Sequence, residues 1–100
     1  MNIAIGQGIW NYPLRVTGTT FRIKSTSEIL SDDVEIERER SNPIDEHAIA
    51  VYSVGEGKRI HIGYLPKEVG IAIFDRQLPA KGKVIWKTEI AEKPGLRILI

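Results

Sequence analysis

Nine glycines and five prolines divide this 100-residue chain into short segments, and this punctuation limits its possible folds more than any other feature. Within most segments, β-branched and aromatic residues alternate with polar ones, which is typical of strands with one solvated face. Only one segment, at about residues 66–78, has the spacing of a helix. We therefore expect a mainly β fold, a small or half-open barrel of five to six strands with one main helix.

The alternating pattern predicts strands at residues 14–23, 34–39, 48–52, 59–64, 83–90 and 96–100, and a mostly polar loop with one helical turn at residues 23–33. Gly18 interrupts the first strand and indicates a bulge or a close backbone approach. Gly55-Glu56-Gly57 predicts a hairpin turn, and Lys93-Pro94-Gly95 is expected to join the last two strands. The last strand could be an exposed edge that pairs with another copy of the chain, so the oligomeric state stays open.

The helix is expected to begin near Pro66, where a missing N–H costs nothing, and to be closed by Pro79 and Gly82. Its buried face should consist of four residues at helical spacing, Leu65, Val69, Ala72 and Ile73.

Composition excludes several classes of protein. The apolar fraction of 42% and the charged fraction of 27% are those of an ordinary globular domain. No apolar run reaches the roughly 20 residues that cross a bilayer, and Met1–Ile5 lacks the basic start of a signal peptide. Without cysteine, neither disulfides nor thiolate metal sites can form. We expect one soluble cytoplasmic domain over residues 1–100, with no membrane partner and no cofactor.

Charge is unevenly distributed along the chain. Eight of the thirteen carboxylates lie between Glu28 and Glu46, where only Arg38 and Arg40 offset them, and twelve of the fourteen Lys and Arg lie elsewhere. If the acidic stretch folds to one side, the rest of the chain could present a basic face to nucleic acid. Equally, the alternating charges could simply solvate a strand.

The residues of catalysis and metal binding are sparse. Asp45 with His47 is the only anchor for a metal-dependent nuclease, and no third or fourth ligand stands at suitable spacing. Asp32, Asp33 and Glu35 lack the ligand spacing of a calcium loop. No serine lies in a Gly-x-Ser-x-Gly elbow, and residues 55–58 are better interpreted as a turn than as a phosphate loop. We therefore do not expect an enzyme or a metal site.

Several aromatic residues stand beside a basic one, which suits stacking on unpaired bases and contact with phosphates. The pairs are Phe21 with Arg22, Tyr64 with Lys67, and Trp86 with Lys83 or Lys87. Phe21 and Trp86 share parity with apolar neighbours, so both could instead belong to the core, and Tyr64 could merely cap the helix entry. Residue patterns alone leave these alternatives open.

The segment Ser41–Val51, SNPIDEHAIAV, resembles the N-P-x-D-x-x-A-I-x-V core of HIRAN domains. Val16-Thr17-Gly18 resembles the V-x-G strand of that family, and residues 62–68, IGYLPKE, resemble its junction between strand and helix. The three blocks occur in family order and the resemblance covers about residues 14–86. At the junction, Gly63 is expected to allow close backbone packing.

The resemblance implies an OB-like open barrel that binds the 3′ end of single-stranded DNA, as HIRAN domains of DNA-remodelling helicases do. It implies that Asn42 and Asp45 contact the terminal sugar, that Lys67 takes a phosphate, and that aromatic side chains stack on bases. The nucleic-acid-binding residues expected on this basis are Phe21, Arg22, Asn42, Asp45, Tyr64, Lys67 and Trp86. Alternatively, Asn42 and Asp45 only fix the turn by bonding to nearby backbone.

Two positions depart from the family pattern. Thr20 stands where an arginine is expected, and Ile44 stands where an aromatic residue commonly follows the proline. These departures, with the net charge of only +1, favour an alternative: a protein-interaction or regulatory module that keeps the fold without binding DNA. Besides single-stranded DNA, a DNA-processing protein is a possible partner, and the choice between DNA and RNA stays open.

Overall fold

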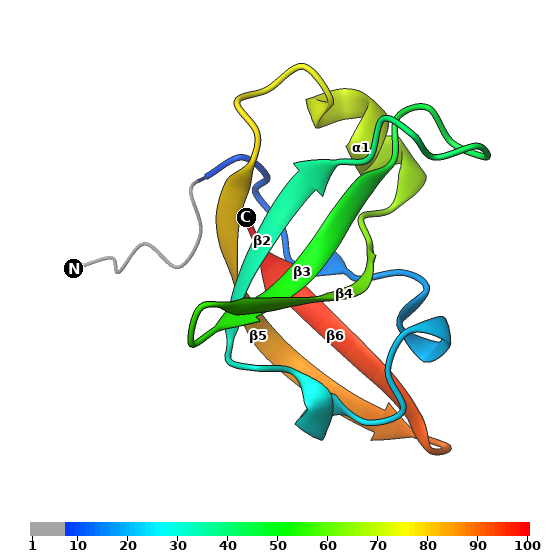
Figure 1. Ribbon diagram of the computed structural model, residues 1–100, viewed down its shortest axis with the longest axis vertical. Helices are drawn as coiled ribbons and strands as arrows, with labels where there is room; N and C mark the ends of the chain where they lie inside the picture. The colour runs from blue at the N-terminus through cyan, green and yellow to red at the C-terminus, as the bar shows by residue number, and fades with distance from the viewer. Residues whose placement is uncertain (1–7) are drawn as a thin grey trace.

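The computed structural model describes residues 8–100, so Met1–Ile5, considered above as a possible leader, lies outside the described residues. Within this range the chain forms six strands, one α-helix and two short 3₁₀ helices, η1 and η2 (Figure 1). In chain order these are β1 Leu14–Arg15, η1 Thr19–Phe21, η2 Thr26–Glu28, β2 Asp33–Arg38, β3 Ile49–Gly55, β4 Lys58–Tyr64, α1 Lys67–Ile73, β5 Ala80–Ile90 and β6 Lys93–Leu99.

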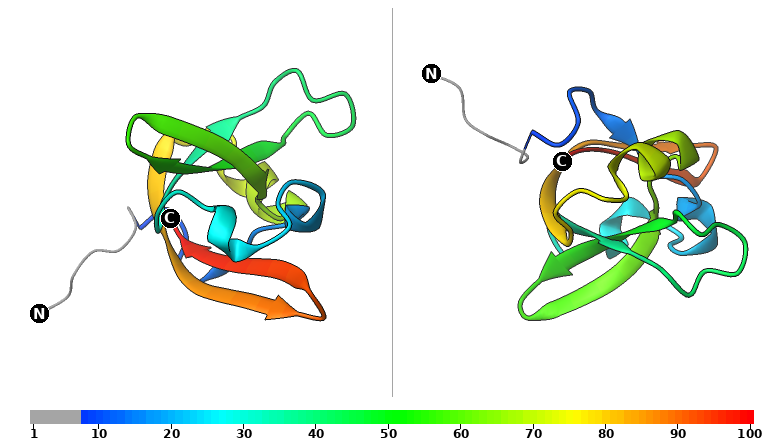
Figure 2. Two further views of the ribbon diagram at one scale, coloured as in Figure 1. Left: turned by 60° about the horizontal axis from the view of Figure 1, so that its bottom comes forward. Right: turned by 90° about the horizontal axis from the view of Figure 1, so that it is seen from above.

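The six strands form an antiparallel sheet in the order β1-β6-β5-β2-β3-β4. The sheet curls into a half-barrel, which Figure 2 shows most clearly in the view from above. Its two edges meet at a bridge between Thr17 and Tyr64, where each backbone N–H donates to the other residue's carbonyl, at 2.8 and 2.9 Å. The mainly β, barrel-like fold predicted from the pattern is therefore confirmed.

Gly63 makes this closure possible. A Cβ at this position would overlap the carbonyl oxygen of Thr17 and would lie 2.6 Å from Val16 Cγ1, far inside van der Waals contact. Only glycine therefore lets the end of β4 approach the segment after β1 so closely, as the sequence predicted for this junction.

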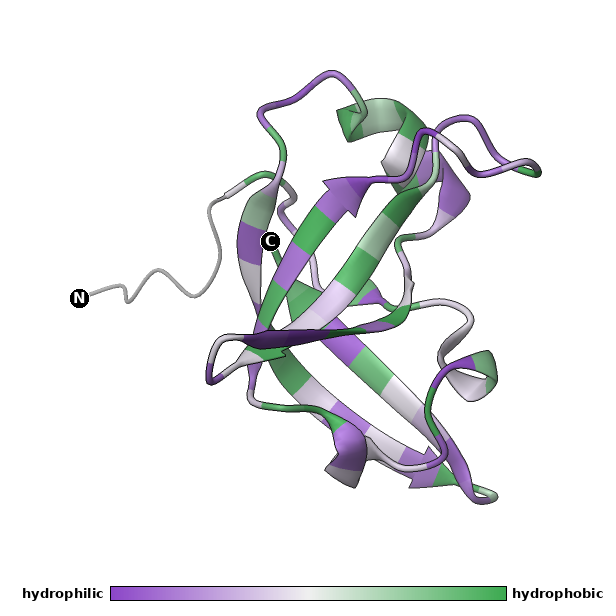
Figure 3. Cartoon of the chain, viewed as in Figure 1, coloured by the Kyte–Doolittle hydropathy of each residue, from purple (hydrophilic) through white to green (hydrophobic). Residues whose placement is uncertain are grey.

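The core lies inside the curl, and the alternation of apolar and polar residues along the strands is visible in Figure 3. Helix α1 lies across one end of the barrel and buries Val69 and Ile73 (Figure 1). The largest fully buried side chains come mainly from β2, β3, β4 and β6 and include Val16, Val34, Ile36, Ile49, Val51, Ile62, Leu96, Ile98 and Ile100.

The first predicted strand is much shorter than expected. β1 covers only Leu14–Arg15, and η1 follows in place of a continued strand. Gly18 initiates η1 with a φ of 72°, and nothing lies within 4 Å of where its Cβ would be. The glycine is thus required by a left-handed backbone conformation, and the predicted bulge or close approach was wrong.

The helix is also shorter than predicted, because it ends at Ile73 rather than near residue 78. The guanidinium of Arg38 in β2 donates to the carbonyls of Phe74 and Arg76 and so satisfies groups that end the helix. Ala72, predicted on the buried face, is exposed. Gly82 does not close the helix but lies within β5.

The two hairpins differ in how well the sequence predicted them. Glu56 and Gly57 form the expected turn between β3 and β4, both with positive φ. The β5–β6 turn lies at Ala91 and Glu92, also with positive φ, and Pro94 belongs to β6.

β6 is not an edge strand, because it pairs with β5 along its length and with β1 at its end. The expectation that the last strand is an exposed edge was therefore wrong. Within the described residues, no helix is long and apolar enough to span a membrane.

Candidate nucleic-acid interface

The loop between β2 and β3 is held in shape by its own side chains. Asn42 Oδ1 accepts hydrogen bonds from the backbone N–H groups of Ile44 and Asp45, both at 2.9 Å. Asp45 Oδ1 accepts one from the N–H of His47, also at 2.9 Å. These are the local bonds expected of Asn and Asp in turns. The motif therefore builds the turn, and any ligand must use what the turn leaves available.

This loop and the start of α1 surround an open pocket, here called the loop pocket, with a volume of about 360 Å³. It is lined by the residues from Asn42 to His47 and by Lys67. Helix and loop lie close because Gly70 faces the His47 carbonyl, where a Cβ would come within 2.7 Å of the oxygen. Three of the predicted site residues, Asn42, Asp45 and Lys67, are thus brought together.

The second carboxylate oxygen of Asp45, Oδ2, accepts no hydrogen bond from the described residues, and its side chain is only half-buried. Asp45 therefore lines the pocket with an acceptor that the described residues leave unused. The carboxylates of Asp45 and Glu46 outnumber the ammonium of Lys67, so the charge around the pocket is negative on balance.

Glu39, which the sequence did not mark, links the pocket to Tyr64. Its Oε1 accepts from the Tyr64 hydroxyl at 2.7 Å and from Asn42 Nδ2 at 3.0 Å. Burial raises the pKa of Glu39, but these hydrogen bonds and the charges of His61 and Arg22 outweigh it and hold the pKa below 4.5. Burial and the bond to Glu39 raise the pKa of the Tyr64 phenol. In the sequence, Glu39 differs from the other alternating glutamates only in standing last, next to the loop. That position was too weak a signal to mark it as a site residue.

Tyr64 is surrounded by a cation and a second ring. Arg22 lies with its Cζ 5.9 Å from the Tyr64 ring centroid and its Nη2 3.5 Å from the hydroxyl. The imidazole of His61 meets the Tyr64 ring edge-on at 4.9 Å. His61 and Tyr64 share a face because a bulge shifts the β3–β4 register at this point. Burial and the charge of Arg22 lower the pKa of His61. Tyr64 therefore does more than cap the helix entry.

Phe21 and Trp86 are exposed, so the alternative that they belong to the core is wrong. Phe21 is 90% exposed because it lies on η1 rather than on a strand. Trp86 is 59% exposed although Val84, two residues earlier, is buried. A bulge shifts the register of β5 against β6 between Val84 and Trp86 and turns the indole outward.

Trp86 does not share the loop pocket with the other predicted residues; it lines a separate groove near β1. The predicted cations beside it are also wrong, because Lys83 and Lys87 form ion pairs with Asp33 and Asp32, the latter at 3.1 Å. Arg97 lies over the indole instead, at 5.9 Å. Arg97 and Trp86 are far apart in the sequence and become neighbours only when β5 pairs with β6, so the sequence did not predict this contact.

Within residues 8–100, no group of three or more His, Asp or Glu side chains is arranged to hold a metal ion. Asp45 and His47 contact each other only through the Asp45 carboxylate and the His47 backbone N–H.

Comparison with known proteins identifies the family. The sequence model of the HIRAN domain matches residues 12–88. The crystal structure of the HIRAN domain of human HLTF is similar, with a TM-score of 0.60 and 20% sequence identity over 87% of this chain and 71% of that chain. No curated protein sequence is significantly similar to this chain. The chain belongs to the HIRAN domain family, whose members are in general DNA-binding modules and not catalysts by themselves.

Proposed function

We propose that this domain binds single-stranded DNA and prefers a strand with a free 3′ hydroxyl. The family supports binding of DNA, and one observation supports the preference for an end: Asp45 lines the loop pocket, and its Oδ2 accepts no hydrogen bond from the described residues. A carboxylate accepts hydrogen bonds and cannot donate them at neutral pH. A terminal hydroxyl can donate to it, whereas an internal phosphodiester has no proton to give.

The charge of the pocket supports discrimination against a blocked end. A 3′ phosphate would carry close to two negative charges into a space lined by Asp45 and Glu46, with one ammonium from Lys67. A single internal phosphate beside Lys67 is compatible with the same arrangement. The pocket is therefore suited to the last nucleotide of an unmodified strand.

Other predicted residues take distinct roles in this proposal. Asn42 acts as a positioning residue, because its oxygen accepts from two backbone N–H groups and its amide nitrogen donates one hydrogen bond to Glu39. The hydroxyl of Tyr64 is likewise occupied by Glu39, which leaves the ring as the part available for stacking. Phe21 and Arg22 supply an exposed ring and a cation beside it.

Fluorescence anisotropy with three labelled oligonucleotides tests the proposal: one with a 3′ hydroxyl, one with a 3′ phosphate, and a blunt duplex. The 3′-hydroxyl strand should bind tightest. Asp45→Asn keeps the Oδ1 acceptor for His47 while replacing the free carboxylate oxygen, so it should abolish the preference for the hydroxyl. Glu46→Gln is the matched control, with the same change of charge at the same pocket; it should reduce the preference through the lost charge but not abolish it, because Asp45 still accepts the terminal hydroxyl. Equal binding of both single strands by the unmodified protein would contradict end recognition.

Lys67→Ala provides an independent readout. With one phosphate fewer neutralised, binding should weaken and the slope of log K against log salt should fall by about 0.7. An unchanged slope would show that Lys67 does not bind a phosphate.

The alternative of a protein-interaction module is favoured by one observation. Ile44, at the position where the family commonly has an aromatic residue, is 93% exposed at the tip of the loop. An exposed isoleucine offers a partner protein an apolar contact and gives a base little to stack on. Absence of binding to all three oligonucleotides at low salt would make this module the better account.

A further inference from the structure

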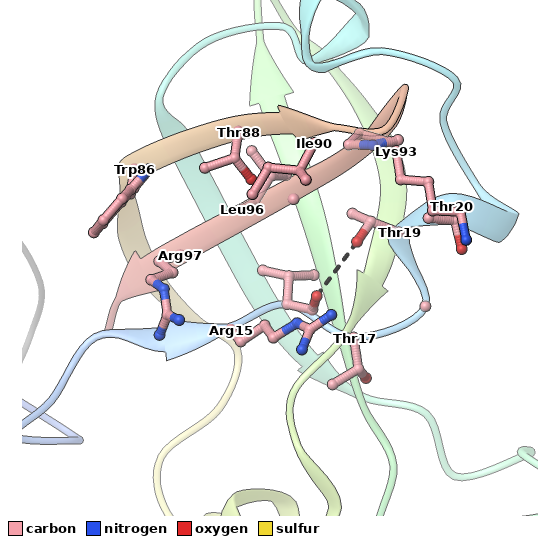
Figure 4. A pocket seen from close by; sticks show the side chains of 14 residues that line it. Arg15, Thr17, Thr19, Thr20, Trp86, Thr88, Ile90, Lys93, Leu96 and Arg97 are labelled. Atoms are coloured by element: carbon pink, nitrogen blue, oxygen red, sulfur yellow. Dashed lines mark hydrogen bonds between the residues drawn. The ribbon is translucent and has the colours of Figure 1, made fainter.

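A second concave surface lies on the opposite side of the Thr17–Tyr64 closure from the loop pocket. This cross-strand groove has a volume of about 610 Å³ and is lined by residues 15–20 on one side and by residues of β5 and β6 on the other (Figure 4). Among the described residues that line it are three cations, Arg15, Lys93 and Arg97, and no carboxylate. The groove is therefore positive, where the loop pocket is negative on balance.

Strand register explains how the charges are concentrated. Arg15 of β1 lies directly opposite Arg97 of β6, and Arg97 lies directly opposite Trp86 of β5. Residues opposite one another in an antiparallel pair share a face, so two guanidinium groups and an indole form a row across three strands. Figure 4 shows the three side chains on the same open side of the sheet. Like charges directly opposite one another destabilise a sheet, which makes this pair costly unless an anion lies over it.

The cations of the row are not neutralised within the described part of the chain. Neither Arg15 nor Arg97 forms an ion pair there, whereas Arg59, Lys83 and Lys87 on other faces all do. Nearby Trp86 is 59% exposed and Ile90, also lining the groove, is 75% exposed. A flat ring beside free cations suits a ligand that has both planar rings and regularly spaced negative charges, which is the chemistry of an unpaired nucleotide strand.

We propose that the cross-strand groove binds the nucleotides that lie 5′ of the terminal nucleotide, on the same strand. This inference rests on the proposed function for the position of the end. Continuity supports the path, because Thr17 lines the groove and is paired to Tyr64, and η1 contacts both β4 and β6. A strand leaving the loop pocket past Tyr64 and Arg22 would cross η1 and reach Arg15, Arg97 and Trp86.

The test compares 3′-hydroxyl strands of about three and about twelve nucleotides, below and within the usual site size of OB-type folds. The longer strand should bind more tightly and with a steeper salt dependence. The double substitution Arg15→Gln with Arg97→Gln should remove that gain and reduce the salt slope for the longer strand by about 0.7 for each phosphate that the variant no longer neutralises. Affinity for the short strand, and its preference for a 3′ hydroxyl, should be unchanged.

Lys58→Gln with Arg76→Gln is the matched control, since it removes two exposed cations from outside both sites and should retain the gain with length. Thermal unfolding without DNA provides a second readout: because the substitution removes a like-charge pair, the Arg15, Arg97 variant should unfold at the same or a higher temperature than the parent. Unfolding at a clearly lower temperature would show that the arginines serve the fold and would overturn the proposal.

The remaining outcomes separate this inference from the proposed function. Equal affinity for short and long strands, with end preference intact, would overturn the groove and leave end recognition standing. Loss of length dependence in the variant without any end preference would support the groove and reject end recognition. Equal competition by a duplex or by a polyglutamate peptide would contradict a site for unpaired nucleotides, because neither presents free bases to Trp86.

Discussion

The loop pocket and the cross-strand groove lie on the two sides of one backbone closure, and they differ in how their polar side chains are used. In the loop pocket, the Asn42 oxygen accepts two backbone hydrogen bonds and one N–H of its amide is bound to Glu39, while one carboxylate oxygen of Asp45 accepts no hydrogen bond from the described residues. In the groove, Arg15 and Arg97 face each other without an acidic partner among the described residues. The first arrangement favours recognition of a particular end, and the second favours affinity for any strand. A binding surface can thus divide specificity and affinity between neighbouring regions.

The largest expected effect comes from breaking the closure on which both regions depend. Gly63→Ala places a Cβ against the Thr17 carbonyl and Val16, and it should lower the free energy of unfolding by about 3 kcal/mol. Gly18→Ala is the comparison, because nothing lies near its Cβ and only the positive φ opposes it, at a cost of about 1 kcal/mol. Urea unfolding measures both values. Equal losses would show that close approach at Gly63 does not govern the closure.

Asn42→Ala tests the loop pocket alone. The variant leaves the N–H groups of Ile44 and Asp45 without their acceptor and should lower the free energy of unfolding by about 2 kcal/mol. Preference for a 3′ hydroxyl should disappear, while the salt slope for a long strand should persist because the groove is untouched. Asn42→Ser, which retains one acceptor, should lose less stability. A variant that kept its end preference would deny Asn42 a positioning role.

Trp86→Ala tests the groove alone. Loss of one stacked base should weaken binding of a long single strand by about 1–3 kcal/mol, measured by anisotropy. The ratio between 3′-hydroxyl and 3′-phosphate strands should not change, and Trp86→Phe should restore most of the affinity. A changed ratio would mean that the two regions do not act separately.

The smallest effect concerns pH and tests the surroundings of His61, which packs against Tyr64. Because burial and Arg22 lower the pKa of His61 in the folded protein, the unfolded chain binds more protons between that pKa and 6.5. The stability that neutral His61 contributes is therefore full above pH 6.5 and is lost as the pH falls through the lowered value. His61→Gln should flatten this part of a stability–pH curve. An unchanged slope in the His61 variant would assign the proton uptake elsewhere.

The sequence predicted those features that depend on neighbours in the chain. The alternation of apolar and polar residues predicted β2, β3 and β4, and Gly55-Glu56-Gly57 predicted the turn that joins β3 to β4. The resemblance to the family, through the blocks at residues 41–51 and 62–68, predicted one site containing Asn42, Asp45 and Lys67, and the three residues line one pocket. Turn chemistry and periodicity operate over a few residues, which is why the predictions of these strands and of the β3–β4 turn were accurate.

Features that depend on register were not predictable in this way. A bulge in β5 reverses the parity that placed Trp86 with the core, and a bulge in the β3–β4 pair joins His61 to Tyr64. Just past the early end of the helix, the carbonyl of Phe74 is bound by Arg38, 36 residues away in the sequence. The row of Arg15, Arg97 and Trp86 exists only once β1, β6 and β5 are paired, and no local pattern indicates it.

The most direct test of two adjoining sites on one strand path is an NMR titration of the ¹⁵N-labelled protein with a 3′-hydroxyl single strand of about twelve nucleotides. Our account predicts that backbone amide signals shift in two groups, around Asp45 in the loop pocket and around Gly18 and Arg97 in the groove, with those near Lys58 unaffected. A 3′-phosphate strand should leave the first group unshifted and still shift the second. Shifts confined to other faces of the barrel, or no shifts at all, would contradict the account.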